Sequence, residues 1–86
     1  MIAVCYLCAR FGRTELTYCH KHHVYPGKNR QASDAAGFVI PLCPRCHSEI
    51  HEKYKLMKSV QQEIQREFEQ THSREEFMKI IGRNYL

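Results

Sequence analysis

The sequence lacks the features that mark several large classes of protein. No apolar run approaches the ~20 residues of a membrane-spanning helix, and the N-terminus does not show the basic-then-apolar order of a secretory signal. Internal repeats and low-complexity linkers are also missing. We therefore expect a single domain over residues 1–86, cytoplasmic and without a membrane partner.

Cysteine, in contrast, is abundant for a chain of this length. Domains as short as 86 residues bury a modest share of their surface and often depend on a metal or on disulfides. Four of the five cysteines form two C-x2-C pairs, which in a reducing compartment favour zinc over disulfides. The pairs supply four soft ligands for one tetrahedral ion, and we predict a structural Zn²⁺ held by Cys5, Cys8, Cys43 and Cys46.

The second C-x2-C pair runs directly into a predicted helix that carries two histidines. Pro44 suits the first position of a helix that starts inside the pair. His47 and His51 are four residues apart, and residues at this spacing share one helical face with their Cβ atoms roughly 5–6 Å apart. Both imidazoles can therefore reach one small ion, which makes a second metal site possible beside the first.

Two strands are expected on either side of a basic loop. Residues 15–25 are rich in β-branched and aromatic side chains and end at Pro26-Gly27, which predicts one extended strand closed by a turn. Residues 27–37 form the loop, with a short helical turn that Gly37 can end in the left-handed conformation. Residues 38–42 then read as a second strand, so that a β-hairpin leads into the helix.

Strand periodicity separates the histidines of the first strand. Alternate residues share a face, which places His20 and His22 on one side and Lys21 and His23 on the other. The neighbouring residues His22 and His23 thus point in opposite directions. One ring can bind a metal while the other remains free as a base. We interpret His20 and His72 as surface residues or hydrogen-bonded core residues without a chemical role.

Cys19 leaves an alternative division of the ligands open. Because Cys19 lies three residues before His22, the seven candidate ligands and Cys19 can be divided between two zinc ions. If it is not a ligand, Cys19 is a small buried apolar residue. The alternative sets are Cys5, Cys8, Cys19 and His22 for one ion and Cys43, Cys46, His47 and His51 for the other.

The last third of the chain is predicted to be helical. From Lys55 onward apolar residues recur every four positions, at Leu56, Val60, Ile64 and Phe68. Ser73 and Glu76 match a capping box that opens a further helix, which Gly82 ends. The fold class is therefore α+β, with a zinc-stapled core over residues 5–52 and a helical C-terminal extension over residues 53–86 packed on it.

Positive charge is concentrated in the part of the chain that carries the cysteines and histidines. Residues 1–58 contain nine basic and four acidic side chains, whereas residues 59–86 contain four and five. A basic, metal-bearing region indicates a polyanionic partner such as nucleic acid. Side chains expected to contact a nucleic-acid backbone are Lys21, Lys28, Arg30, Arg45 and Lys53.

The order of these elements resembles that of the HNH endonucleases, which have the ββα-metal, or His-Me finger, fold. The resemblance covers residues 5–52 and is carried by His22-His23, by Cys43-x2-Cys46-His47 and by His51. It is strongest to the small zinc-stapled, phage-type members, which implies a bacterial or phage-infected cell. The central Asn of the family has no clear counterpart, because Asn29 lies too early and Phe38 occupies the expected position.

The resemblance implies a role for each histidine. His23 would be the general base, and His22, His47 and His51 would hold a catalytic divalent ion, which could be Mn²⁺, Mg²⁺, Ni²⁺ or Zn²⁺. The expected partner is DNA, double-stranded and contacted through its backbone, and no small-molecule cofactor is expected. The resemblance thus implies a metal-dependent endonuclease that hydrolyses DNA phosphodiester bonds.

Two other hypotheses about function remain open on the sequence alone. The missing Asn and the two-zinc alternative would also suit a catalytically lapsed zinc-binding module that acts as a DNA- or protein-binding adaptor. A redox role for the C-x2-C pairs is the third reading, although neither pair lies in a βαβ context. Metal stoichiometry and a cleavage assay would separate these classes.

Overall fold

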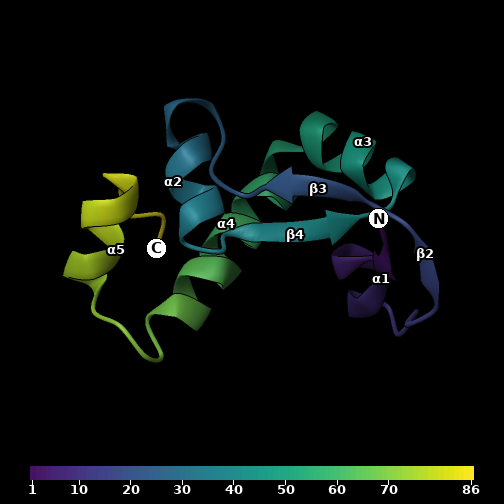
Figure 1. Ribbon diagram of the computed structural model, residues 1–86, viewed down its shortest axis with the longest axis horizontal. Coiled ribbons are helices and arrows are strands. Elements are labelled where there is room, and N and C mark those ends of the chain that lie inside the picture. The colour runs from purple at the N-terminus through teal and green to yellow at the C-terminus, as the bar shows by residue number, and fades with distance from the viewer.

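A two-stranded hairpin forms the centre of the computed structural model, which describes residues 1–86. Strand β3 (His20–His23) pairs antiparallel with β4 (Val39–Leu42), with His22 opposite Ile40. The segment between the strands contains a short 3-10 helix η1 (Gly27–Asn29) and helix α2 (Arg30–Ala35). Figure 1 shows the hairpin flanked by α1 and α3 at one end and by α2 and α5 at the other.

The single strand expected over residues 15–25 is wrong in one respect, because it breaks at Cys19. Strand β2 (Leu16–Tyr18) pairs with β1 (Ile2–Val4) in a separate two-stranded sheet, and β3 begins at His20. The backbone N–H of Cys19 donates to the Met1 carbonyl at 2.7 Å, and its thiol turns inward toward the Ala3 carbonyl at 3.6 Å. This contact with the N-terminal residues ends one pairing and allows the next to start.

Two helices begin at the C-x2-C pairs. Helix α1 (Tyr6–Arg10) follows Cys5, and α3 (Pro44–Glu52) follows Cys43, each of which has an extended backbone at the N-cap. Pro44 occupies the first turn of α3, as predicted from its fixed φ angle. Helix α3 packs on both strands of the hairpin, while α1 lies against β4.

The C-terminal helices agree with the sequence prediction. Helix α4 (Tyr54–Phe68) packs on α3, and its apolar stripe faces the core. Helix α5 (Arg74–Ile81) begins with the expected capping box between Ser73 and Glu76. It ends at Gly82, whose φ of +83° is the left-handed conformation that favours glycine. None of the helices combines the length and the apolar character needed to cross a membrane.

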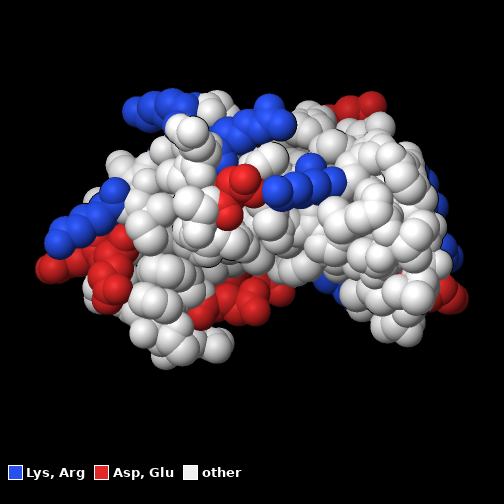
Figure 2. All heavy atoms as spheres, viewed as in Figure 1, with Lys and Arg blue, Asp and Glu red and all other residues white.

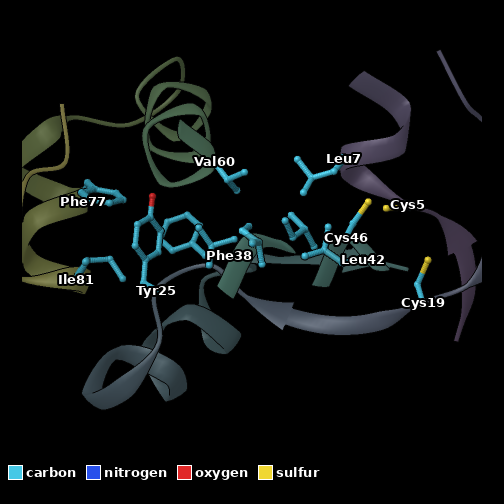
Figure 3. Close-up of a cluster of buried hydrophobic side chains, with 13 residues drawn as sticks. Cys5, Leu7, Cys19, Tyr25, Phe38, Leu42, Cys46, Val60, Phe77 and Ile81 are labelled. Carbon is cyan, nitrogen blue, oxygen red and sulfur yellow. The ribbon is translucent and has the colours of Figure 1, made fainter. Parts of the chain in front are cut away.

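One buried cluster of thirteen side chains joins the hairpin to α1, α3, α4 and α5. Figure 3 shows its two ends, an aromatic end around Tyr25, Phe38 and Phe77 and a cysteine end around Cys46 and Leu42. At the aromatic end Tyr25 is fully buried and donates its hydroxyl to the Gln61 carbonyl at 2.6 Å. The α+β class is thereby confirmed, and the hairpin that carries the histidines is held from both ends.

Candidate functional site

The first cluster of metal-binding side chains consists of the four paired cysteines. The ligand atoms of Cys5, Cys8, Cys43 and Cys46 all lie within 4.8 Å of one another. The Cys8 Sγ is 4.0 Å from the Cys43 Sγ and 3.8 Å from the Cys46 Sγ. Zn–S bonds of about 2.3 Å in a tetrahedron place the sulfur atoms about 3.8 Å apart. The spacing therefore fits a zinc ion, and all five cysteines are free of disulfides.

The local fold explains why these thiols converge. In each pair the first cysteine precedes a helix and the second lies in its first turn, so both side chains lie at the same helix start. Burial opposes ionisation of Cys5, but hydrogen bonds from the backbone of Cys43 and Cys8 lower its pKa to about 7. Burial raises the pKa of Cys46 and of Cys8. A bound cation would therefore be needed to hold four thiolates together at neutral pH.

Cys19 belongs to neither cluster. Its side chain is 1% exposed and its thiol contacts the Ala3 carbonyl, whereas His22 groups with the histidines of α3. Burial raises the pKa of the Cys19 thiol, as expected for an inert residue. The structure thus brings together the four-cysteine set, and it does not form the alternative set in which Cys19 and His22 share an ion with Cys5 and Cys8.

The second cluster consists of three histidines from β3 and α3. The ligand atoms of His22, His47 and His51 lie within 4.8 Å of one another, with ring centroids 5.0 to 5.4 Å apart. His22 is 3% exposed, and its Nε2 atom is buried without a hydrogen-bond partner. A buried polar atom left unpaired costs about 1–3 kcal/mol, so this orphaned nitrogen is one that a metal ion would satisfy.

The electrostatic surroundings of His22 and His47 favour their neutral forms. Burial, followed by the nearby rings of His47 and His51, lowers the pKa of His22 to about 4. Burial likewise lowers the pKa of His47, with His51 and His20 contributing. A neutral imidazole retains the lone pair that a metal binds, so the donor set fits a divalent ion of the transition series.

His23 opens onto the same hollow from the other face of β3. A cavity of about 260 Å³ is lined by His22, His23, His47 and His51 together with Lys21 and Arg30. Burial alternates along the strand as expected, since Lys21 is exposed and His22 is buried. The Nε2 atom of His23 lies 3.8 Å from the Asp34 carboxylate. One hollow therefore contains three possible ligands and one imidazole outside the ligand set.

The basic side chains predicted to contact nucleic acid divide into two groups. Lys21, Lys28 and Arg30 line an adjoining cavity of about 570 Å³ beside His23, and Figure 2 shows basic groups gathered over β3 and α2. Arg45 instead lies at the cysteine cluster, where the Cys46 thiol raises its pKa. Lys53 is at the end of α3, with its Nζ atom 3.9 Å from Glu49.

Two residues near the hollow were not assigned a role from the sequence. The Nδ1 atom of His20 lies 2.9 Å from Nδ1 of His47, and its place on the same strand face as His22 was the available signal. Asp34, on α2, accepts from the Lys21 Nζ at 2.6 Å, and Lys21 lowers the pKa of its carboxyl. No pattern in the sequence links Asp34 to the first strand, because their contact depends on how α2 folds back.

Comparison with known proteins identifies one family. A family model described as HNH endonuclease matches residues 5–53, which include both C-x2-C pairs, the hairpin and α3. Residues 54–86 lie outside the match. No curated protein and no solved structure gave a significant match to the chain.

Proposed function

The chain belongs to the HNH endonuclease family, and from this premise we propose that it is a metal-dependent nuclease that hydrolyses DNA phosphodiester bonds. One observation carries the proposal, namely that a compact three-histidine ligand set and a further histidine open onto the same hollow. Hydrolysis of a phosphodiester requires a base for the attacking water and a positive charge for the departing oxygen. A candidate base and a ligand set that could hold a cation line one cavity.

The histidine cluster would hold the divalent ion. His22, His47 and His51 supply nitrogen ligands only, which favours Zn²⁺, Ni²⁺ or Mn²⁺ over Mg²⁺, an ion that prefers oxygen ligands. When bound there, a divalent ion would stabilise the negative charge that develops on the phosphate oxygens. The cysteine cluster would hold a separate structural Zn²⁺, because four thiolates close the coordination shell.

His23 is the proposed general base. It lies on the opposite face of β3 from His22, so its ring is not required by the ion. Imidazole is the side chain whose ordinary pKa lies closest to neutrality, which suits it to accept a proton from water near pH 7. With Nε2 directed toward Asp34, the Nδ1 atom is the one we assign to proton transfer.

The basic surface beside His23 is proposed to bind the DNA backbone. Lys21, Lys28 and Arg30 line the cavity that adjoins the base, so phosphates bound there would flank the scissile bond. Contacts of this kind position a duplex without reading its sequence. Their contribution should weaken as the salt concentration rises, because binding releases counterions from the DNA.

Plasmid cleavage tests the proposal. Purified protein with its zinc is incubated with supercoiled DNA and Mn²⁺, Mg²⁺ or Ni²⁺, and nicked and linear products are measured. We expect His23→Ala to lower the rate by about 10²–10⁴-fold, the usual contribution of a general base, with ion binding retained. His72→Ala removes an exposed histidine far along the chain and serves as the control. Equal rates for His23→Ala and the unmodified chain would reject the assigned base.

A second candidate function is a nucleic-acid-binding adaptor that no longer cleaves. The observation that favours it is the position of Phe38, where the order of the motifs leads us to expect the family's Asn. Phe38 is 5% exposed and packs on Tyr25, Phe68 and Phe77, so no polar side chain is available from that position. DNA binding in a gel-shift assay, without cleavage under any of the three ions, would support the adaptor.

A further inference from the structure

His20 contacts His47, one of the proposed metal ligands. Its Nδ1 atom lies 2.9 Å from Nδ1 of His47, and the two rings meet edge to face with centroids 5.1 Å apart. The rings of Tyr18 and His20 pack edge to face with centroids 5.4 Å apart. Across the hairpin His20 pairs with Leu42. His20 is therefore held in place by the strand and its neighbours, in contact with His47.

The distance between the two nitrogens separates a hydrogen bond from a shared ion. Two imidazoles on one tetrahedral ion, with bonds of about 2.0–2.1 Å, would have their nitrogens about 3.3–3.4 Å apart. The observed 2.9 Å is shorter and lies within the range of about 2.7–3.2 Å for hydrogen bonds donated by N–H groups. The compact ligand group also contains His22, His47 and His51 but not His20. His20 is thus a hydrogen-bond partner of a ligand.

A hydrogen bond between two Nδ1 atoms contains a single proton, and its location decides which nitrogen of His47 can bind a metal. A neutral imidazole has one N–H and one bare nitrogen. If Nδ1 of His47 carries the proton, its Nε2 keeps a free lone pair. If His20 donates instead, the proton of neutral His47 is on Nε2, and that atom cannot bind a metal.

We propose that His20 is a positioning residue that accepts a hydrogen bond from Nδ1–H of His47 and thereby fixes Nε2 of His47 as the metal-binding atom. The inference rests on the ion site of the proposed function. Metal-binding histidines commonly donate their second nitrogen to an acceptor, which sets both tautomer and ring orientation. Here the acceptor is a second imidazole, supplied by the strand that also supplies His22.

Metal titration tests this role without DNA. Protein with zinc on its cysteines is titrated with Ni²⁺ by calorimetry, and His20→Ala is expected to weaken binding about 10–100-fold, the usual effect of losing such a partner. His20→Glu should bind within a few-fold of the unmodified chain, because a carboxylate also accepts from Nδ1–H. His72→Ala is the control. An unchanged Kd for His20→Ala, or equal losses for the Ala and Glu variants, would overturn the proposal.

A second measurement uses the unmodified chain and so does not depend on how the variants fold. Two-bond ¹H–¹⁵N NMR of the protein with Zn²⁺ at the histidine site should show the proton of His47 on Nδ1 and that of His20 on Nε2. A proton on Nε2 of His47, or four imidazoles at the ion by X-ray absorption, would contradict the assigned role. Cleavage is scored separately, so tight Ni²⁺ binding without cleavage rejects the proposed function and leaves this inference standing.

Discussion

The cysteine and histidine clusters share helix α3 but differ in how they are closed. Cys43 and Cys46 at its start face Cys5 and Cys8 at the start of α1, while His47 and His51 in the following turns face His22 from β3. Four protein ligands complete a tetrahedron, whereas three leave a position open. Closed sites are typical of structural zinc and open ones of catalysis, so the number of ligands supports the different roles proposed for adjacent turns of one helix.

The two clusters also differ in charge. Zinc with four thiolates would carry a net charge of about −2, whereas an ion on three neutral imidazoles would keep its positive charge. With both ions bound, a phosphate would be attracted to the second site and repelled by the first. This favours Arg45, which lies beside Cys8 and Cys46, as a partner of the thiolates over the phosphate contact expected from the sequence.

Removing a cysteine ligand should have the largest effect. Cys46→Ser deletes a buried ligand from the closed cluster. A structural zinc contributes about 10–16 kcal/mol in small zinc-dependent peptides, as much as the whole stability of most domains. We therefore expect loss of zinc and of cooperative thermal unfolding, measured by metal analysis and circular dichroism.

Two matched variants test whether the loss of zinc and fold is specific to the cysteine cluster. Cys19→Ser changes a buried cysteine outside the cluster and should retain one zinc per chain, with a loss of about 1–3 kcal/mol for burying a hydroxyl. His51→Ala removes an exposed ligand of the open cluster and should retain both zinc and fold. A Cys46→Ser protein that keeps its zinc and its melting transition would contradict the structural role of the cysteine cluster.

The parts of the molecule that the sequence predicts well are those set by short-range geometry. The C-x2-C spacing, the four-residue spacing of His47 and His51, and the alternation along β3 each depend on neighbouring residues only. The capping box at Ser73 is likewise local, and the structure confirms it. Short-range spacing alone left two divisions of the cysteine and histidine ligands open, and the resemblance to the HNH family supplied the grouping of His22 with His47 and His51, whose ligand atoms lie within 4.8 Å of one another.

The parts that the sequence does not predict depend on contacts between distant segments. The break at Cys19 follows from its hydrogen bond to Met1, eighteen residues away. The contact of His20 with His47 spans twenty-seven residues, and Asp34 reaches Lys21 only because α2 folds back over the hairpin. Nothing in the local pattern around these residues indicates their partners, so each was assigned a generic role or none.

The metal affinities of the two clusters should also depend differently on pH, and we expect this effect to be smaller than that of removing a ligand. Burial raises the pKa of Cys8 and Cys46, so both thiols are protonated near pH 7 and must release their protons to bind zinc. Burial lowers the pKa of His22 to about 4 and also lowers that of His47, so these rings are already neutral above pH 6.5. Lowering the pH therefore weakens zinc binding by the thiols, and it leaves these two imidazoles available.

The expected change in metal affinity with pH follows from the number of protons that the metal displaces from its ligands. Each displaced proton changes the apparent affinity about tenfold per pH unit, so the two thiols alone should lower zinc affinity about 100-fold between pH 8 and pH 7. Ni²⁺ affinity at the histidines should change by less than about tenfold over the same range. Competition with a chromophoric chelator at both pH values measures the two slopes, and equal slopes would show that the clusters do not differ in protonation.

The smallest predicted effect concerns Asp34, which lies between Lys21 and His23. Its carboxylate lies 3.8 Å from Nε2 of His23 and would orient the base by charge attraction, but its negative charge stands in the basic cavity proposed for phosphates. Asp34→Ala should therefore lower kcat about tenfold, less than the loss of the base itself. It should also tighten DNA binding a few-fold at low salt, because Lys21 is freed.

Stability should change little in this variant, since an exposed ion pair contributes little to folding. Glu49→Ala removes another carboxylate, which pairs with Lys53 and does not line the hollow, and is the matched control for kcat. Steady-state cleavage kinetics and salt-dependent binding measure the two effects independently. If DNA binding tightens while kcat is unchanged, Asp34 restrains only Lys21, and the orientation of His23 must come from the hairpin itself.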